Sequence, residues 1–467
     1  MSTKTQEILD IYKAKVMPTY APSVVIASGK GVTVRDADGL TLYDFTSGIG
    51  VHNVGYRNEK VVKAIQDQAA KLTHSSNLFA NEPATRLAEK LVEISGLNGK
   101  VFFGNSGAEA NEAAIKLARK WGSQNGGRYE IVTMRQGFHG RTLATITATA
   151  QAWCQEGYDP LPVGFAYADY NDLESVKAAV NDKTVAIMLE AVQGEGGVIP
   201  APVEFLQTVR RVTRELGIPM IVDEIQCGIG RSGRFFAFEY ADIVPDVILA
   251  SKAIGGTQPM SVVIYNKDLD KWTAGAHAGT FRGNQLAMAA GTVVMNRVSQ
   301  PEFLADVRRK GDYLRERMYQ LKEKVSIIGD IRGKGLMSGC EFVDPNGEPD
   351  CLGSLPASGE IAARVQHMCF ENKLVMEKGG RHGSVMRCLC ALNVSDDELN
   401  TMFEIYEKVV IEVDRNVLIC NNNSIFRINI SYESNSITIF CSVNCCLKGI
   451  SRCYDYITID NKSTCAS

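Results

Sequence analysis

Between about Thr33 and Pro259, short apolar runs alternate with stretches whose apolar residues recur at helical spacing. Five runs have the length of strands: KVFF (100–103), YEIVTM (129–134), VAIMLEAV (185–192), IPMIVDEI (218–225) and VPDVILAS (244–251). They are apolar without a period of two, as expected for strands covered on both faces. The alternation predicts an α/β fold, with a mainly parallel sheet and crossover helices.

The pattern changes after about Ala290 and predicts a second, smaller α+β domain. Residues 303–325 form one long charged helical stretch, and strand-like segments follow at 327–342 and 374–392. Near the start, residues 31–45 predict a hairpin that turns at DADG and packs with the smaller domain. We therefore predict an N-terminal segment (1–48), a large domain (49–290), a small domain (291–416) and an atypical tail (417–467).

Composition limits the partners. The 467 residues are 45% apolar and 22% charged, as in a large globular protein, and the net charge is −3. With no long basic run, nucleic acid and anionic membranes are not expected as main partners. No stretch approaches the ~20 apolar residues of a membrane span, and the N-terminus lacks the features of a secretory signal. We expect a cytoplasmic location and small-molecule partners.

The tail differs from the rest of the chain because it is rich in Asn, Ser and Ile. It holds six of the 13 cysteines, and the other seven are scattered before residue 391. A disulfide or metal-binding appendage is one interpretation, and an extension that the core does not need is the other. The adjacent Cys445 and Cys446 lack zinc-ligand spacing, which favours the second. No metal site is predicted.

The segment FFGNSGAEANEAAIKLARKWG (102–122) predicts a strand, a small-residue turn and a helix with one apolar face. Ser106 and Glu109 have capping-box spacing. The helix is either an ordinary core helix or one whose free N–H groups and positive end hold a phosphate.

Two charged residues end apolar runs. Asp223 is followed by Gly228, Gly230 and Gly233, which have GxGxxG spacing. A dinucleotide site would need these glycines to join the strand directly to a helix, so we reject it. Asp223 is either structural or the partner of a cation at the sheet edge. Lys252 ends the next run, where desolvation would lower its pKa and free its amine as a nucleophile.

A phosphate turn, a carboxylate and a nucleophilic lysine together are the parts of a pyridoxal phosphate (PLP) site. From about residue 20 to 412 the chain resembles class III, ω-amino-acid aminotransferases of PLP fold type I. The resemblance rests on ordered motifs: NSGAEANEAAIKLAR, GFHGRT, EAVQGEGG, VDEIQCGIGRSG, SKAIGG, GTFRGN and RGKGLM. It implies a large, mainly parallel sheet domain and a smaller α+β domain.

The resemblance also implies roles for cofactor-binding residues. Lys252 matches the Schiff-base lysine that shuttles a proton, and Asp223 matches the partner of the pyridine nitrogen. The other matching positions are Ser106, Gly107 and Ala108 (phosphate turn), Phe138 and Ile225 (ring sandwich), His139 (packing or hydrogen bonding), Gln226 (phenolic oxygen) and Thr280 (phosphate of the neighbouring subunit's cofactor). A homodimer with shared active sites is therefore implied.

Substrate carboxylates require cations, and a planar guanidinium binds a carboxylate in a fork. Arg141 and Arg387 match the family's carboxylate-binding arginines, the second of which receives the α-carboxylate of 2-oxoglutarate or glutamate. Glu195 matches the glutamate that neutralises this arginine while the ω-amine is processed. A surface role for Arg141 and a salt bridge for Arg387 are the alternatives.

The amino donor is less closely defined. The segments around Arg282 and Arg387 resemble diaminobutyrate:2-oxoglutarate aminotransferases, whereas residues 44–56 and 74–91 resemble acetylornithine aminotransferases. We favour L-2,4-diaminobutyrate, because we expect Arg282 and Arg387 near the substrate pocket. Acetylornithine, ornithine and 4-aminobutyrate stay open, as do a PLP racemase, an ammonia-lyase and a dimeric binding protein. Thr257 stands where relatives usually have glycine.

Overall fold

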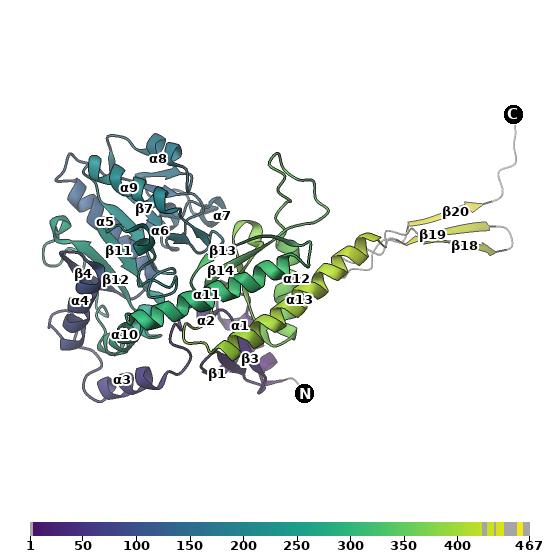
Figure 1. Ribbon diagram of the computed structural model, residues 1–467, viewed down its shortest axis with the longest axis horizontal. Helices are drawn as coiled ribbons and strands as arrows, with labels where there is room; N and C mark the ends of the chain where they lie inside the picture. The colour runs from purple at the N-terminus through teal and green to yellow at the C-terminus, as the bar shows by residue number, and fades with distance from the viewer. Residues whose placement is uncertain (1–2, 423–426, 434–435, 443–454, 461–467) are drawn as a thin grey trace. The chain divides into compact units, whose positions relative to one another are not determined.

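The computed structural model describes residues 3–422, 427–433, 436–442 and 455–460. The chain has two compact units, Met1–Tyr406 and Glu407–Ser467. The first unit contains a large sheet, two four-stranded sheets and the helices around them (Figure 1). The predicted boundaries at residues 48, 290 and 416 stay predictions.

The large sheet has seven strands. In spatial order they are β4 (Gly99–Gly104), β12 (Ser261–Asn266), β11 (Val247–Ala250), β10 (Met220–Asp223), β7 (Thr184–Glu190), β5 (Glu130–Met134) and β6 (Phe165–Ala168). All five predicted strands are among them. The parallel α/β prediction is confirmed except at β12, which is antiparallel to both of its neighbours. An apolar run has the same composition in either direction, so the sequence did not indicate this reversal.

Helices lie on both faces of this sheet (Figure 1). The helices of this part of the unit are α3 (Glu59–Ala69), which packs on α10, and α4 (Glu82–Ser95), α5 (Gly107–Gly122), α6 (Leu143–Ala148), α7 (Ala152–Gln155), α8 (Leu173–Ala179), α9 (Val203–Glu215) and α10 (Gln285–Val298). The apolar face predicted for α5 is confirmed. Ala110, Ala114 and Leu117 are buried against strands of the sheet, and Trp121 packs partly buried beside them.

Two smaller sheets follow the predicted pattern. One is antiparallel, in the order β13 (Ile328–Lys334), β14 (Met337–Phe342), β17 (Val385–Cys388) and β16 (Glu377–Gly379). The other contains β1 (Ile26–Lys30), β2 (Thr33–Asp36), β3 (Thr41–Asp44) and β15 (Leu374–Val375). The predicted hairpin is β2–β3, and β3 also pairs in parallel with β15. The N-terminal strands thus share a sheet with a segment from the C-terminal third.

The remaining elements of the first unit are helical segments and one small pair of strands. They are α1 (Lys4–Lys15), α2 (Ser47–Gly50), α11 (Pro301–Lys322), α12 (Gly359–Glu371), β8 (Val192–Gln193) and β9 (Ile199–Pro200). The long charged helix predicted near residue 303 is α11, which packs along β13 and β14 (Figure 1). A further helix, α13, spans Asp396–Asn422.

The second unit contains an antiparallel sheet of β18 (Arg427–Glu433), β19 (Ser436–Ser442) and β20 (Asp455–Asp460). The side chains of its cysteines lie outside the described part of the chain, so both interpretations of the tail stay open. No described helix is both long and apolar enough to cross a bilayer. Within the described residues, no three His, Cys, Asp or Glu side chains are grouped as metal ligands would be.

Candidate functional site

Side chains that follow the parallel strands converge at one edge of the large sheet, where α/β folds bind ligands. They surround a cavity of about 310 Å³. Its lining residues are Gly107, Ala108, Asn111, Phe138, His139, Gly140, Arg141, Glu190, Glu195, Asp223, Ile225, Gln226, Ser251 and Lys252. Ten of the 13 predicted site residues are in this set, and Ser106, Thr280 and Arg387 are not.

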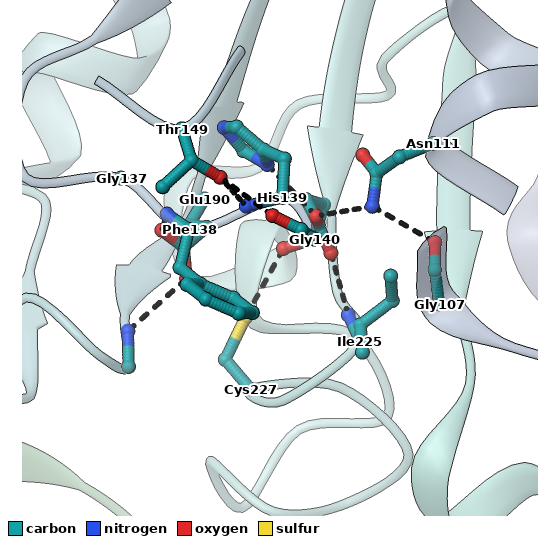
Figure 2. Close-up of polar contacts among 12 residues, drawn as sticks. Gly107, Asn111, Gly137, Phe138, His139, Gly140, Thr149, Glu190, Ile225 and Cys227 are labelled. Atoms are coloured by element: carbon teal, nitrogen blue, oxygen red, sulfur yellow. Dashed lines mark hydrogen bonds and ion pairs between the residues drawn. The ribbon is translucent and has the colours of Figure 1, made fainter. Parts of the chain in front are cut away.

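Asp223, at the end of β10, is held by three donors. Its Oδ2 accepts from Asn111 Nδ2 at 3.1 Å and lies 2.9 Å from His139 Nδ1, and its Oδ1 accepts the Ile225 N–H at 3.0 Å (Figure 2). Burial would lower the pKa of His139, but the hydrogen bond and charge of Asp223 raise it. Asp223 therefore has a fixed orientation, and it favours the protonated form of His139. Asn111 was not predicted, although it lies one helical turn after Gly107.

The N-terminus of α5 opens into the cavity through Gly107 and Ala108. A Cβ on Gly107 would lie 3.0 Å from Ile225 Cδ1, so only glycine leaves this approach free. Ser106 is the N-cap, and its side chain accepts the Glu109 N–H at 3.2 Å. The predicted capping box is wrong in its second half, because Glu109 accepts the N–H of Asn105 instead. Ser106 caps the helix and does not line the cavity.

Lys252 follows β11 and lines the cavity with Asp223. Burial lowers the pKa of its ammonium group. Thr257, five residues after Lys252, has a φ of 80°, a left-handed conformation that favours glycine. The loop therefore has the geometry expected for a glycine, and threonine adopts it at a cost of about 1–3 kcal/mol.

Phe138 and Ile225 line the cavity as predicted, and Glu190 supports them from β7. Glu190 Oε2 accepts the Phe138 N–H at 3.0 Å, and Oε1 accepts the Gly194 N–H at 3.1 Å. Burial raises the pKa of Glu190 to about 7. Sequence reasoning did not single out Glu190, although it lies within a predicted strand, ends β7 and pairs in register with Asp223. It joins the Phe138 segment to the loop that carries Glu195.

Arg387 lies on β17, and its side chain is fully buried beside the cavity. Its Nη1 donates to Glu195 Oε1 at 2.8 Å and its Nη2 to Glu195 Oε2 at 3.2 Å. Nη2 also donates to Glu377 Oε1 at 2.6 Å. Burial would lower the pKa of Arg387, but the charges of Glu195 and Glu377 raise it. Glu377 was not predicted, although it lies opposite Arg387 in the β16–β17 pair.

Gln226 connects this ion pair to the cavity. It lies 3.5 Å from Glu195 through Nε2 and 3.5 Å from Arg387 through Oε1. Arg141 is on the exposed side of the cavity, with its guanidinium carbon 5.5 Å from the centre of the Phe138 ring and 4.7 Å from that of Trp153. The two aromatic rings hold the Arg141 guanidinium by cation–π contact. Trp153 was not predicted.

Thr280 and Arg282 lie in a second cavity, of about 980 Å³. Arg282 Nη1 donates to the His277 carbonyl at 2.8 Å, and Arg282 Nε lies 3.8 Å from Glu109. We expected Arg282 near the substrate pocket, but it does not line the 310 Å³ cavity of this chain, and its guanidinium carbon lies 4.6 Å from the centre of the Phe102 ring. The role of Thr280 toward a neighbouring subunit stays a prediction.

Comparisons with known proteins agree with this geometry. The family model for aminotransferase class-III matches residues 15–410. An acetylornithine aminotransferase of Caldanaerobacter subterraneus is 40% identical over 404 residues, which are 86% of this chain and 98% of that protein. A diaminobutyrate–2-oxoglutarate aminotransferase of Rhizobium meliloti is 39% identical over 415 residues, covering 81% of this chain and 86% of that protein.

Solved structures agree as well. An ornithine aminotransferase of Toxoplasma gondii, which holds PLP at partial occupancy, superposes with a TM-score of 0.81 at 28% identity, covering 88% of this chain and 96% of that one. An acetylornithine aminotransferase of Elizabethkingia anophelis superposes with a TM-score of 0.75 at 28% identity, covering 88% of this chain and all of that one (100%).

The described residues fit PLP. Gly107 and Ala108 line the cavity at the α5 N-terminus, where free N–H groups favour an anion such as a phosphate. Asp223 supplies a buried carboxylate for a ring nitrogen, and Lys252 supplies an amine in the same cavity. The fold, the cavity and the matched family model agree, and the chain belongs to the PLP-dependent class III aminotransferases.

Proposed function

We propose that this aminotransferase moves the terminal amino group of a short diamino or ω-amino acid to 2-oxoglutarate, giving the semialdehyde and glutamate. L-2,4-Diaminobutyrate is the proposed donor. The observation that carries the proposal is the single cavity in which Lys252 and Asp223 face a closed Arg387–Glu195 ion pair. A second candidate donor is N-acetylornithine, which the 40% identity to acetylornithine aminotransferases supports.

PLP, when bound, supplies an electron sink for the carbon that carries the amino group. Lys252 would attach it and move the proton at that carbon, because burial lowers the lysine pKa and makes the uncharged amine accessible. Asp223, oriented by His139 and Asn111, would keep the ring nitrogen protonated. Phe138 and Ile225 would sandwich the ring.

The remaining cofactor contacts would come from the helix end and the Gln226 side chain. The N–H groups at Gly107 and Ala108 would bind the phosphate, with Ser106 fixing the helix end. Gln226 would reach the phenolic oxygen. Thr280 would bind the phosphate of the partner's cofactor, so we propose a homodimer.

The two arginines would divide the substrates between them. Arg141 would bind the carboxylate of the donor, because its guanidinium lines the open side of the cavity. Arg387 would bind 2-oxoglutarate after Glu195 rotates away. While the donor is bound, Glu195 would keep Arg387 neutralised and so prevent binding of a second carboxylate.

A donor panel tests this function. Purified protein loaded with PLP is incubated with 2-oxoglutarate and L-2,4-diaminobutyrate, N-acetylornithine, ornithine or 4-aminobutyrate, and glutamate is measured. We expect glutamate from at least one of them and the highest kcat/KM with diaminobutyrate. No glutamate from any donor, with racemised or deaminated amino acid instead, would favour a racemase or lyase. Absence of any reaction would favour a binding protein.

Substitution of each arginine separates the half-reactions. Arg387→Leu is expected to raise the KM for 2-oxoglutarate by at least about tenfold with a smaller change in the donor KM, because a charged hydrogen bond to a carboxylate is worth about 1.5–3 kcal/mol. Arg141→Leu is expected to raise the donor KM instead. Steady-state kinetics with each substrate varied in turn measure the split, and equal effects of both variants on both substrates would contradict it.

A further inference from the structure

Arg387 has two carboxylate partners, although one would neutralise it. Glu195 accepts hydrogen bonds from both terminal nitrogens of Arg387, and Glu377 Oε1 accepts a further one from Nη2 at 2.6 Å. The second oxygen of Glu377, Oε2, is buried and has no hydrogen-bond partner in the described structure. The guanidinium therefore does not use the full acceptor capacity of Glu377.

The charges of these three side chains do not cancel. When both carboxylates are ionised, these side chains carry one surplus negative charge beside Glu195, which lines the cavity. Burial raises the pKa of Glu377 and the charge of Arg387 opposes this effect. The field of Glu377 reaches the reacting end of the cavity, since its charge acts to raise the pKa of Lys252 against the effect of burial.

The backbone around this cluster is fixed by hydrogen bonds. The Gly380 N–H donates to the Glu195 carbonyl at 3.0 Å, and Arg332 Nε donates to the Gly197 carbonyl at 2.8 Å. The Glu195 segment and the β16 segment that carries Glu377 are thus tied together. The backbone that carries the two carboxylates is thus fixed, and only side-chain rotation can change their arrangement around Arg387.

We propose that Glu377 determines donor specificity, because its surplus negative charge beside the closed Arg387–Glu195 pair favours a donor that carries a second ammonium group. A donor whose second amine is acylated, or that has none, gains nothing from this charge. The proposal rests on the proposed function, in which the donor enters while Glu195 covers Arg387. Glu377 would act through the electric field of the cluster, without direct contact with the substrate.

Glu377→Gln tests the proposal, because glutamine keeps a hydrogen-bond acceptor for Arg387 and removes only the charge. The ratio of kcat/KM for diaminobutyrate to that for 4-aminobutyrate is measured at saturating 2-oxoglutarate, together with the same ratio against N-acetylornithine. Both ratios are expected to fall by about tenfold or more, chiefly through the KM for diaminobutyrate. An unchanged ratio, or an equal loss with all donors, would overturn the proposal.

Two further variants keep the test interpretable. Glu377→Asp retains the charge and is expected to retain most of the wild-type ratio, even if its overall activity falls. Glu371→Gln removes an exposed carboxylate on α12 and is expected to leave the ratio unchanged.

If the wild type transaminates none of the donors, the proposed function fails. If it transaminates them but prefers the acylated or monoamine donor, only the role of Glu377 fails.

Discussion

Replacing Lys252 with alanine is expected to lower kcat by at least about 10⁴-fold, because the variant loses both the nucleophile and the general base. The melting temperature of the cofactor-free protein is expected to stay the same or rise. Burial lowers the pKa of Lys252, so folding disfavours its charged form and its removal relieves that cost at neutral pH. Glutamate formation and thermal unfolding measure the two effects.

The covalent role of Lys252 has its own readout. Borohydride treatment of the PLP-loaded wild type, followed by peptide mass spectrometry, is expected to place the added cofactor mass on the peptide that contains Lys252. Lys267→Ala, which removes an exposed lysine after β12, serves as the control and should behave like the wild type. Labelling at another lysine, or retained transamination in the Lys252 variant, would contradict the assignment.

Replacing Asp223 with asparagine is expected to lower kcat by about 10³-fold. A carboxylate and a ring cation about 4 Å apart interact by about 4 kcal/mol at an effective dielectric constant of about 20, and each 1.36 kcal/mol is about tenfold in rate. Asparagine preserves the volume and part of the hydrogen bonding with Asn111 and Ile225, so the fold should persist. Single-turnover kinetics measure the chemical step directly.

Asn111→Ala provides a graded comparison for Asp223. It removes one donor to Asp223 and leaves the charge, so its effect is expected to be only about tenfold. The charge of Asp223 would not explain its role if the kcat of Asp223→Asn stayed within tenfold of the wild-type value. The same conclusion would follow if that kcat fell no further than the kcat of Asn111→Ala.

The residues found from the sequence share one property: they follow an apolar strand or begin a helix. Lys252, Asp223 and Gly107 are recognisable because parallel strands deliver their carboxyl ends to one sheet edge. The motifs then identify the side chains between those ends. The class III prediction is confirmed by the family model, which matches residues 15–410.

The residues that the sequence did not reveal depend on relations across the fold. Glu377 matters because it faces Arg387 in an antiparallel pair, and Glu190 because it lies in register with Asp223. Neither register can be read from one segment alone. The direction of β12 was missed for a similar reason, since an apolar run carries no sign of its orientation.

The fixed backbone at Glu195 has a consequence for the timing of turnover. With its carbonyl bonded to Gly380, Glu195 can leave Arg387 by rotating its side chain, which is about a third exposed (31%). Exposed side chains rotate in picoseconds to nanoseconds, and breaking two charged hydrogen bonds of about 1.5–3 kcal/mol each would slow the rotation of Glu195 by about 10²–10⁴-fold. The rotation would still be faster than a typical turnover of about ten per second. Opening of the Arg387–Glu195 pair would therefore not limit the rate at which the enzyme passes from one half of the reaction to the other.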